Sequence, residues 1–349
     1  MFEFGINVDW KQSPGKPFKG DWKNASTYFA NNLYDALLRD AWGPSQGNSK
    51  ENGAYTTWQG GIVLNPAVNS YNEFLKSQME RKFQLSHFQG IVVDRSDWIQ
   101  VYDLTMDDGV SWVQSGSAYS MKRAFRDTTA SLRKQMDSNR SHSCMMLNTL
   151  GYSMLSLMGP FDGTFSEGHA VNAVGLLGIV SPSILWTYTN ADFDGDFDAF
   201  ARRHLYMGTY PMAPFPGNDH SIDPGNETVM TDYARYGPLF KCLKGAKWDL
   251  RAHAAHVVAP VEGMALVNAF VDSEDDQYFS VVVEAKDQMS DVIIDVLLAK
   301  KSGPSFHALY PNGSPVWKHL ANVSLEGNRA RISVPILGDV TAAMVRIKY

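Results

Sequence analysis

The stretch Gly90-Ile-Val-Val-Asp94 points most directly to a fold in this 349-residue sequence. A β-branched apolar run without polar alternation is typical of a strand buried on both faces, as in a parallel sheet. A carboxylate directly after such a run is costly to bury unless it has a partner. We therefore predict a central parallel strand that ends at Asp94, and we expect Asp94 to have a specific role.

Apolar runs and helical patterns alternate on both sides of this strand. The predicted strands are 2–8, 61–64, 90–94, 143–147, 161–166, 183–188 and 208–215. The predicted helices are 27–39, 71–83, 119–136, 169–177, 196–206 and 229–243. This alternation indicates an α/β fold, with a (β/α)8 TIM-type barrel as the leading architecture. A doubly wound sheet is the alternative, but it would be expected to carry a Gly-rich phosphate loop, and neither G-x-G-x-x-G nor G-x-x-x-x-G-K-[ST] occurs.

The pattern changes after about residue 252. Short strand-like runs follow one another at 257–261, 264–271, 278–284, 292–298, 306–310, 316–320, 330–334 and 342–347. Turn signals separate them, such as Pro311-Asn-Gly313 and Glu326-Gly-Asn328. We therefore predict two domains, a barrel over 1–252 and an all-β antiparallel sandwich over 253–349.

Composition excludes several classes of protein. Lys and Arg number 31 against 37 Asp and Glu, for a net charge of −6, so we expect no nucleic-acid partner. Two cysteines exclude a disulfide-dense scaffold, although a single bridge stays open. No apolar run reaches the roughly 20 residues of a membrane span. No signal peptide is visible, and the chain opens directly on a predicted strand, so a fragment of a longer polypeptide is an open interpretation.

Two carboxylates are candidates for catalysis. Functional side chains of a barrel lie where its strands end, and this places Asp94 and Glu167 on the functional face. The alternative interpretations are a loop-capping Asp94 paired with Arg95, and a Glu167 that favours the positive end of a helix dipole. Asp162 begins the strand that Glu167 ends, so we expect a structural role for it on the opposite face. Two carboxylates across a cleft are the minimal apparatus of glycoside hydrolysis.

Aromatic and polar residues gather at other predicted strand ends. Flat aromatic faces can stack on sugar rings, and amide, carboxylate and imidazole groups can bind hydroxyls. Ordinary packing at the barrel rim is the alternative. The candidate substrate-binding residues are Trp10, Asp97, Trp98, Trp186, Tyr188, Asn218, Asp219 and His220.

An acidic segment, 190–198, has the alternating oxygen ligands and the sixth-position glycine of a calcium loop. Its twelfth position is Ala201, where such a loop needs a bidentate carboxylate. A helix start capped by Asp194 or Asp196 is the preferred interpretation. We accordingly predict no metal and no cofactor.

Four segments carry a family resemblance. They are Phe88-Gln-Gly-Ile-Val-Val-Asp-Arg-Ser-Asp-Trp98, Phe161-Asp-Gly-Thr-Phe-Ser-Glu-Gly168, His204-Leu-Tyr-Met-Gly208 and Pro214-Phe-Pro-Gly-Asn-Asp-His220. Together they resemble glycoside-hydrolase-like barrel proteins and, more widely, retaining α-glycosidases of the α-galactosidase and α-glucosidase type.

The resemblance implies a barrel followed by a β-sandwich and a carbohydrate substrate. It places Asp94 at the nucleophile position, which ends the fourth strand. Glu167 falls at the acid/base position, which ends the sixth strand and usually holds Asp. Residues 61–64 would then form the third strand and 2–8 the second. The first strand would be missing, so we expect either an incomplete barrel or further domains or chains that complete it.

Two hypotheses about function follow. The first is a glycoside hydrolase that uses Asp94 and Glu167. The second is a non-catalytic structural or carbohydrate-binding protein derived from a glycosidase barrel, part of a larger extracellular assembly. Five glycosylation sequons, at Asn24, Asn139, Asn226, Asn312 and Asn322, favour an extracellular or secretory location.

Overall fold

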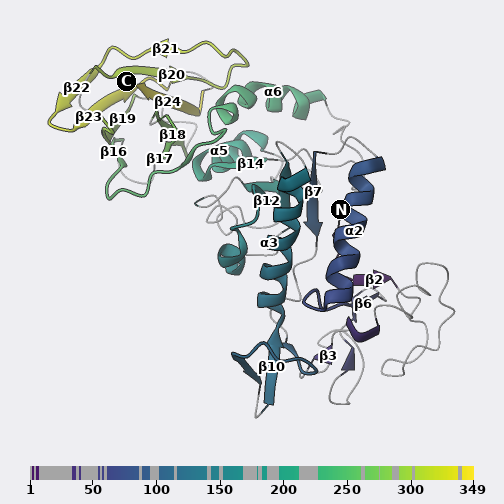
Figure 1. Ribbon diagram of the computed structural model, residues 1–349. Coiled ribbons are helices and arrows are strands. Elements are labelled where there is room, and N and C mark those ends of the chain that lie inside the picture. Colours follow the sequence, from purple (N-terminus) through teal and green to yellow (C-terminus); the bar gives the residue numbers. More distant parts are fainter. Residues whose placement is uncertain are drawn as a thin grey trace. The chain divides into compact units, whose positions relative to one another are not determined.

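The computed structural model divides the chain into two compact units (Figure 1). Unit 1 is Met1–Leu150 with Ser156–Asp162, and unit 2 is Gly151–Leu155 with Gly163–Tyr349. The structure describes residues 2–3, 5–7, 34–36, 39–40, 54–55, 57–58, 61–85, 89–94, 102–113, 116–139, 143–148, 152–167, 179, 183–186, 196–211, 227–260, 264–274, 276–284, 291–300, 303–336 and 340–349.

A parallel ladder forms the centre of unit 1. Strand β7 (Gly90–Asp94) lies between β1 (Phe2–Glu3) and β11 (Cys144–Asn148), and both neighbours run parallel to it. The neighbours on both sides of β7 confirm the prediction of a central strand. Ile91 and Val93 are buried on one face, and Val92 on the other face is half-buried. The 3-10 helix η3 (Tyr152–Leu157) comes after β11 in the chain.

Two amphipathic helices belong to the same unit, as Figure 1 shows beside β7. Helix α2 (Asn69–Leu85) buries a stripe at every fourth residue, formed by Tyr71, Leu75, Met79 and Phe83. Helix α3 (Met121–Asn139) packs beside α2, and Asn72 Nδ2 donates a hydrogen bond of 3.1 Å to Thr128 Oγ1. These helices confirm the predictions over 71–83 and 119–136, except that Tyr119 and Ser120 belong to a strand, Gly116–Ser120.

The N-terminal strand prediction is wrong in its arrangement. Residues 2–8 do not form one strand, because β1 joins the parallel ladder while β2 (Gly5–Asn7) pairs antiparallel with β6 (Gly61–Val63). Strand β6 also pairs antiparallel with β5 (Thr57–Trp58), and β1 is the direct neighbour of β7. The expected order of 2–8, 61–64 and 90–94 therefore fails. Short apolar runs have the same pattern in parallel and antiparallel pairs, so periodicity cannot separate the two.

A second sheet of unit 1 was not predicted. This accessory sheet has the strand order β4 (Ala54–Tyr55), β3 (Arg39–Asp40), β8 (Tyr102–Asp103), β10 (Gly116–Ser120) and β9 (Ser111–Val113). Neighbouring strands pair antiparallel. Because Arg39 lies in β3, the predicted helix 27–39 cannot extend to it; the part described as helical is the 3-10 helix η1 (Tyr34–Ala36).

Unit 2 begins with another parallel ladder. Strand β13 (Ser183–Trp186) lies between β12 (Gly163–Glu167) and β14 (Thr209–Pro211). Helices α5 (Phe197–Met207) and α6 (Glu227–Lys241) belong to this unit and match the predicted helices. The described strands support the α/β part of the fold prediction, and closure into a (β/α)8 barrel stays a prediction.

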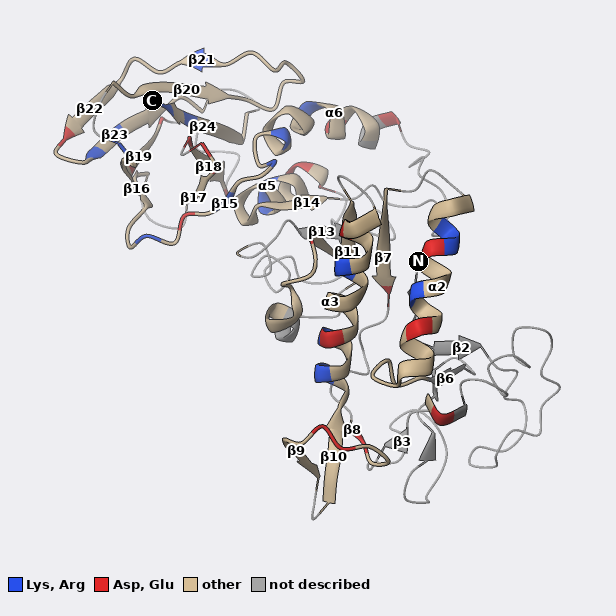
Figure 2. Ribbon diagram, viewed as in Figure 1, with Lys and Arg blue, Asp and Glu red and all other residues tan. Residues whose placement is uncertain are grey.

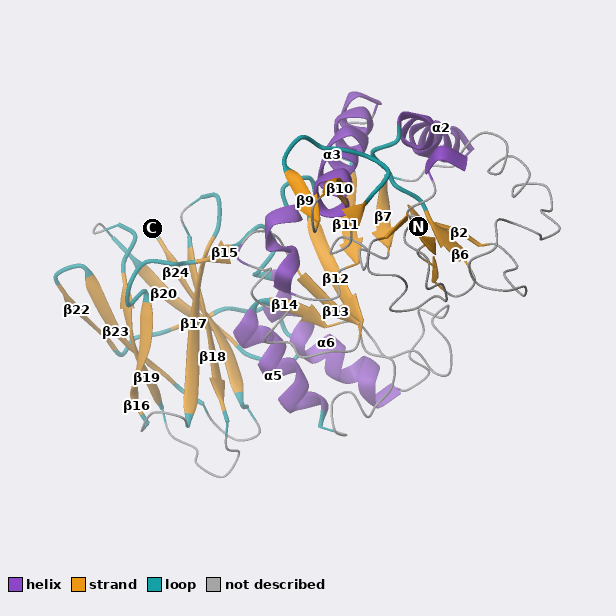
Figure 3. Cartoon of the chain, turned by 90° about the horizontal axis from the view of Figure 1, so that it is seen from below, coloured by secondary structure: helices purple, strands orange, loops and turns teal. Residues whose placement is uncertain are grey.

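The remainder of unit 2 is a β-sandwich, as predicted (Figure 3). One sheet has the order β15 (Lys247–Trp248), β17 (Ala265–Val271), β18 (Gln277–Val283), β24 (Ala342–Lys348), β20 (Ser305–Leu309) and β21 (Lys318–His319). The other has the order β16 (Ala255–Ala259), β19 (Val292–Leu297), β23 (Arg329–Val334) and β22 (Val323–Glu326). All pairs within the sandwich are antiparallel, and β15 lies before the predicted boundary at 252.

Helices α5 and α6 share a hydrophobic core with the first sandwich sheet. The helices contribute Phe197, Phe200, Ala201, Leu205, Tyr236, Leu239 and Phe240, and the sheet contributes Phe270, Val282, Leu309, Ala342 and Met344. Asp198 of α5 is a polar centre beside this core. It accepts hydrogen bonds from Tyr236 Oη at 2.5 Å, Thr341 Oγ1 at 2.7 Å and Arg202 Nε at 3.1 Å. The helices and the sandwich are therefore one packed body.

We predict that Gly208→Ala destabilises this packing. Gly208 ends α5 with φ of 68°, and an added Cβ would lie 2.5 Å from Phe270 Cε1. The strained backbone costs about 1–2 kcal/mol, and the overlap with Phe270 adds about 1–3 kcal/mol. Chemical denaturation would measure both terms together.

Gly327→Ala is the matched control for this prediction. Gly327 has φ of 62° with no atom near the added Cβ, so its substitution should cost only the backbone term. Equal losses of unfolding free energy in the two variants would contradict the tight contact between α5 and the sandwich.

Candidate functional site

Asp94 and Asn148 form a buried pair at the carboxyl ends of two parallel strands. Asp94 ends β7 and is 6% exposed, and Asn148 ends β11 and is 1% exposed. The register pairs Val93 with Leu147, so the next residues along both strands are neighbours. Asn148 Nδ2 donates a hydrogen bond of 2.5 Å to Asp94 Oδ1. This bond fixes the carboxylate at a strand end where functional side chains of α/β folds are found.

The third strand of this ladder also ends in a polar residue. The Cα of Glu3, the last residue of β1, is paired in register with that of Asp94. Sequence reasoning missed Glu3 because 2–8 was treated as one strand, and it missed Asn148 because the predicted strand stopped at Leu147. The signal for Asn148 is nevertheless present in the sequence, because it directly follows an apolar run as Asp94 does.

Glu167 and Trp186 lie side by side in unit 2. Glu167 ends β12, Trp186 ends β13, and their Cα atoms are register partners. The parallel ladder therefore places a predicted acid/base beside a predicted sugar-stacking residue. Asp94 and Glu167 belong to different units, and their pairing stays a prediction.

The other predicted substrate-binding residues lie outside the described part of the chain. They are Trp10, Asp97, Trp98, Tyr188, Asn218, Asp219 and His220. Their roles stay predictions.

Two further strand-end polar residues of unit 1 have structural contacts. Asp162 Oδ2 accepts a hydrogen bond of 2.7 Å from Met145 N and forms an ion pair with Arg133, in line with the structural role predicted for it. Asn65 is buried, and its Nδ2 donates a hydrogen bond of 2.9 Å to the buried Asp103. Both residues hold elements of unit 1 together.

The acidic segment before α5 supplies a helix cap. Asp196 Oδ1 accepts a hydrogen bond of 3.1 Å from Ala199 N, as expected of an N-cap residue. Residues 190–195 lie outside the described chain. Within the part that is described, no group of three or more His, Cys, Asp or Glu side chains is arranged to hold a metal ion. Cys144 and Cys242 are free thiols.

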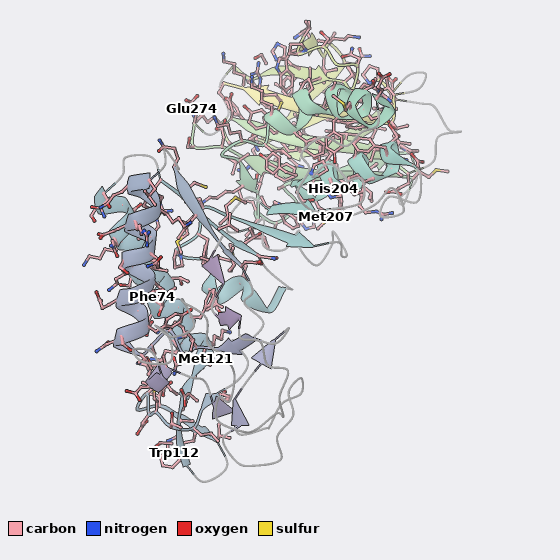
Figure 4. All side chains as sticks on the ribbon, turned by 90° about the vertical axis from the view of Figure 1, so that its right-hand side faces the viewer. Phe74, Trp112, Met121, His204, Met207 and Glu274 are labelled. Atoms are coloured by element: carbon pink, nitrogen blue, oxygen red, sulfur yellow. The ribbon has the colours of Figure 1, made fainter. Side chains whose placement is uncertain are left out.

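His204, from one of the resembling segments, is a packing residue of α5 (Figure 4). Its ring is fully buried, lies 4.0 Å from the Phe200 ring between centroids, and Nδ1–H donates a hydrogen bond of 2.8 Å to Phe200 O. Burial lowers the pKa of His204 to about 4, because the charged imidazolium loses its hydration. The folded protein therefore holds this ring in its neutral form at neutral pH.

Comparisons with known proteins show the fold of the chain. No family model and no curated protein sequence matches it. A cycloisomaltooligosaccharide glucanotransferase of Paenibacillus sp., solved with cycloisomaltoheptaose, is similar with a TM-score of 0.59 and 10% identity. That match covers 91% of this chain and 71% of the other.

A GH36 α-galactosidase of Geobacillus stearothermophilus, solved with 1-deoxygalactonojirimycin, is also similar. Its TM-score is 0.50 at 9% identity, and the match covers 93% of this chain and 42% of the α-galactosidase. These matches show that the chain has a glycosidase-like fold, as the resemblance implied. Within the described residues, no helix is both long and apolar enough to cross a membrane.

We predict that the free energy of unfolding decreases when the pH is lowered below about 6.5, because of His204. The pKa of His204 is about 4 in the folded protein and 6.5 in its ordinary, exposed state. Between these pH values the unfolded chain binds a proton at His204 that the folded chain does not bind. The full contribution is present above pH 6.5. Lowering the pH from 6.5 to 5 should cost about 2 kcal/mol of unfolding free energy, at about 1.4 kcal/mol per pH unit.

Denaturation of wild type and His204→Leu at several pH values tests this. Between pH 4 and 6.5, the unfolding free energy of His204→Leu should depend on pH less steeply than that of wild type, by the slope that corresponds to about one proton. A His204→Leu slope equal to that of wild type would refute the prediction.

Proposed function

We propose that the protein is a glycoside hydrolase of the two-carboxylate type. The observation that carries the proposal is the buried Asp94 at the carboxyl end of β7, held by Asn148. A buried carboxylate costs free energy, and a fixed, desolvated carboxylate suits a nucleophile. The glycosidase-like fold supports a carbohydrate substrate.

In this proposal, Asp94 and Glu167 act on opposite sides of the glycosidic bond. A carboxylate oxygen of Asp94 bonds to the anomeric carbon while the bond to the leaving oxygen breaks, and Glu167 donates its proton to that oxygen. Glu167 then takes a proton from water. The water oxygen bonds to the anomeric carbon, the bond to Asp94 breaks, and the sugar leaves with both carboxyl groups restored.

The proposal includes the wider architecture. The parallel ladders belong to a (β/α)8-type barrel over 1–252, and a β-sandwich follows over 253–349. Trp186 stacks on the sugar beside Glu167, which the register of β12 and β13 supports. The remaining substrate contacts are Trp10, Asp97, Trp98, Tyr188, Asn218, Asp219 and His220.

We also propose a secretory location. Three of the five sequon asparagines fall on described residues, Asn139, Asn312 and Asn322, and all three are exposed. Exposure is a requirement for glycosylation. Treatment of protein from a eukaryotic host with an N-glycosidase would reveal attached glycans by a drop in mass.

Asp94→Ala should lower kcat for an aryl glycoside by at least about 10³-fold, roughly 4 kcal/mol of transition-state stabilisation. The substrate is first identified by screening α- and β-linked aryl glycosides with wild type. Azide or formate should restore part of the rate, because a small anion fits the space of the missing carboxylate and can attack the anomeric carbon.

The control is Asp103→Ala, which also removes a buried carboxylate that accepts a hydrogen bond from an asparagine. Folded Asp103→Ala protein should keep its kcat and gain nothing from azide. Full activity in Asp94→Ala would eliminate Asp94 as nucleophile. Carbohydrate binding without hydrolysis by wild type would favour the non-catalytic alternative.

Asn148→Ala should lower kcat/KM by about 10–100-fold, because a hydrogen bond to a charged group contributes about 1.5–3 kcal/mol. Asn65→Ala is the matched control, since Asn65 is buried and donates to Asp103. It should lower the melting temperature without changing kcat/KM of the folded enzyme. Equal kinetic effects in the two variants would show that Asn148 has no specific role.

A further inference from the structure

The chain segment between β7 and α3 builds three strands of the accessory sheet. Strands β8, β9 and β10 all lie in this connection, so they follow the strand that ends in Asp94 (Figure 2). Connections that follow parallel strands carry binding residues in α/β folds, because they start at the functional edge of the sheet. The connection is therefore a place to look for ligand contacts beyond Asp94.

Asp108 links described parts of this connection through hydrogen bonds. Its Oδ1 accepts hydrogen bonds from Val110 N at 3.0 Å and Ser111 N at 2.7 Å, and its Oδ2 accepts from Ser120 N at 3.1 Å. Burial would raise the pKa of Asp108, but hydrogen bonds from Ser120, Val110 and Ser111 outweigh it and lower the pKa to about 2. The carboxylate thus stays charged and ties the start of β9 to the end of β10.

A large aromatic side chain is exposed on the strand that Asp108 links to β10. Trp112 of β9 is 69% exposed, and Val110 just before the strand is equally exposed. The register pairs Trp112 with the small Ser117, whereas Ser111 is paired with the buried Ala118. Figure 4 shows Trp112 at one end of unit 1, beyond Met121 and Phe74. The indole is therefore available to a ligand.

The size and charge of this surface select the ligand. Two exposed side chains offer far less than the roughly 800 Å² per partner of a stable protein interface. One indole matches the flat C–H face of one sugar ring. The segment Ser111–Ser120 itself has no charged residue, and the carboxylates of Asp108 and Asp107 lie two and three residues before Val110 (Figure 2). A phosphate group at this surface would meet negative charge rather than the cluster of Lys and Arg that it requires. These features together favour an uncharged sugar over nucleic acid or another protein.

We propose that Trp112 is a stacking platform for a neutral sugar ring of a polysaccharide chain. The platform binds a part of the polymer away from the bond that is cleaved. It rests on the proposed function, and it adds that the substrate is a neutral polymer longer than the sugars held at Asp94. Remote contacts of this kind strengthen binding of long substrates and leave short substrates unaffected.

The test separates binding of polymers from hydrolysis of small substrates. Full-length wild type, Trp112→Ala and Trp112→Tyr run in native gels containing dextran, soluble starch, galactomannan or xylan, and aryl-glycoside hydrolysis is measured in parallel. We expect wild type to be retarded by at least one polymer. Trp112→Ala should bind that polymer about tenfold more weakly, equivalent to ~1.4 kcal/mol.

Two variants complete the expected result. Trp112→Tyr keeps an aromatic face and should retain most of the binding. Leu85→Ala removes an equally exposed apolar side chain at the end of α2 and should bind like wild type. All variants should hydrolyse an aryl glycoside at the wild-type rate.

Three outcomes would overturn the platform. The first is that Trp112→Ala binds the polymer as tightly as wild type does. The second is that no polymer retards wild type. The third is that wild type self-associates in sedimentation and Trp112→Ala does not. The hydrolysis of aryl glycosides by Asp94→Ala, compared with wild type, tests the proposed function separately. Polymer binding that depends on Trp112 without any hydrolysis would support the platform and reject the hydrolase.

Discussion

A carboxylate buried at the end of an apolar strand is the constraint around which unit 1 is arranged. The run Ile91-Val92-Val93 brings Asp94 into the interior, where an unpartnered charge would be unfavourable. Asn148 lies on the adjacent strand, in register, and donates to it. A slip of one residue between β7 and β11 would remove this donor, so the polar pair and the ladder register support each other. Helices α2 and α3 then cover apolar surface that belongs to the same unit.

Much of the fold was predictable because long, regular patterns dominate it. The helical pattern of 71–83, the apolar run of 90–94 and the short strand-like runs after about residue 252 each predict an element that the structure contains. Asp94 was predictable as a strand end because it directly follows an apolar run. The structure ends β7 at Asp94, β12 at Glu167 and β13 at Trp186.

The elements that the sequence did not predict correctly have physical explanations as well. Strands β1 and β2 are each too short to carry a periodic signal, and a change of sheet between Glu3 and Gly5 leaves no mark in the sequence. Strand β22 was missed because its residues are mostly exposed, so it lacks the apolar alternation of its partner β23. The accessory sheet depends on hydrogen bonds of Asp108 and Asp103, which composition and periodicity do not reveal.

The accessory sheet also joins two connections that are far apart in the chain. Strand β3 comes from the segment between β1 and α2, β8 from the segment between β7 and α3, and Asp40 is paired with Asp103. Loops of α/β folds usually vary independently, which lets one scaffold acquire new specificities. Here an insertion or deletion in either segment would disturb the strands of the other. A change of length in one segment would therefore have to be matched by a change in the other, because both segments supply strands to the same sheet.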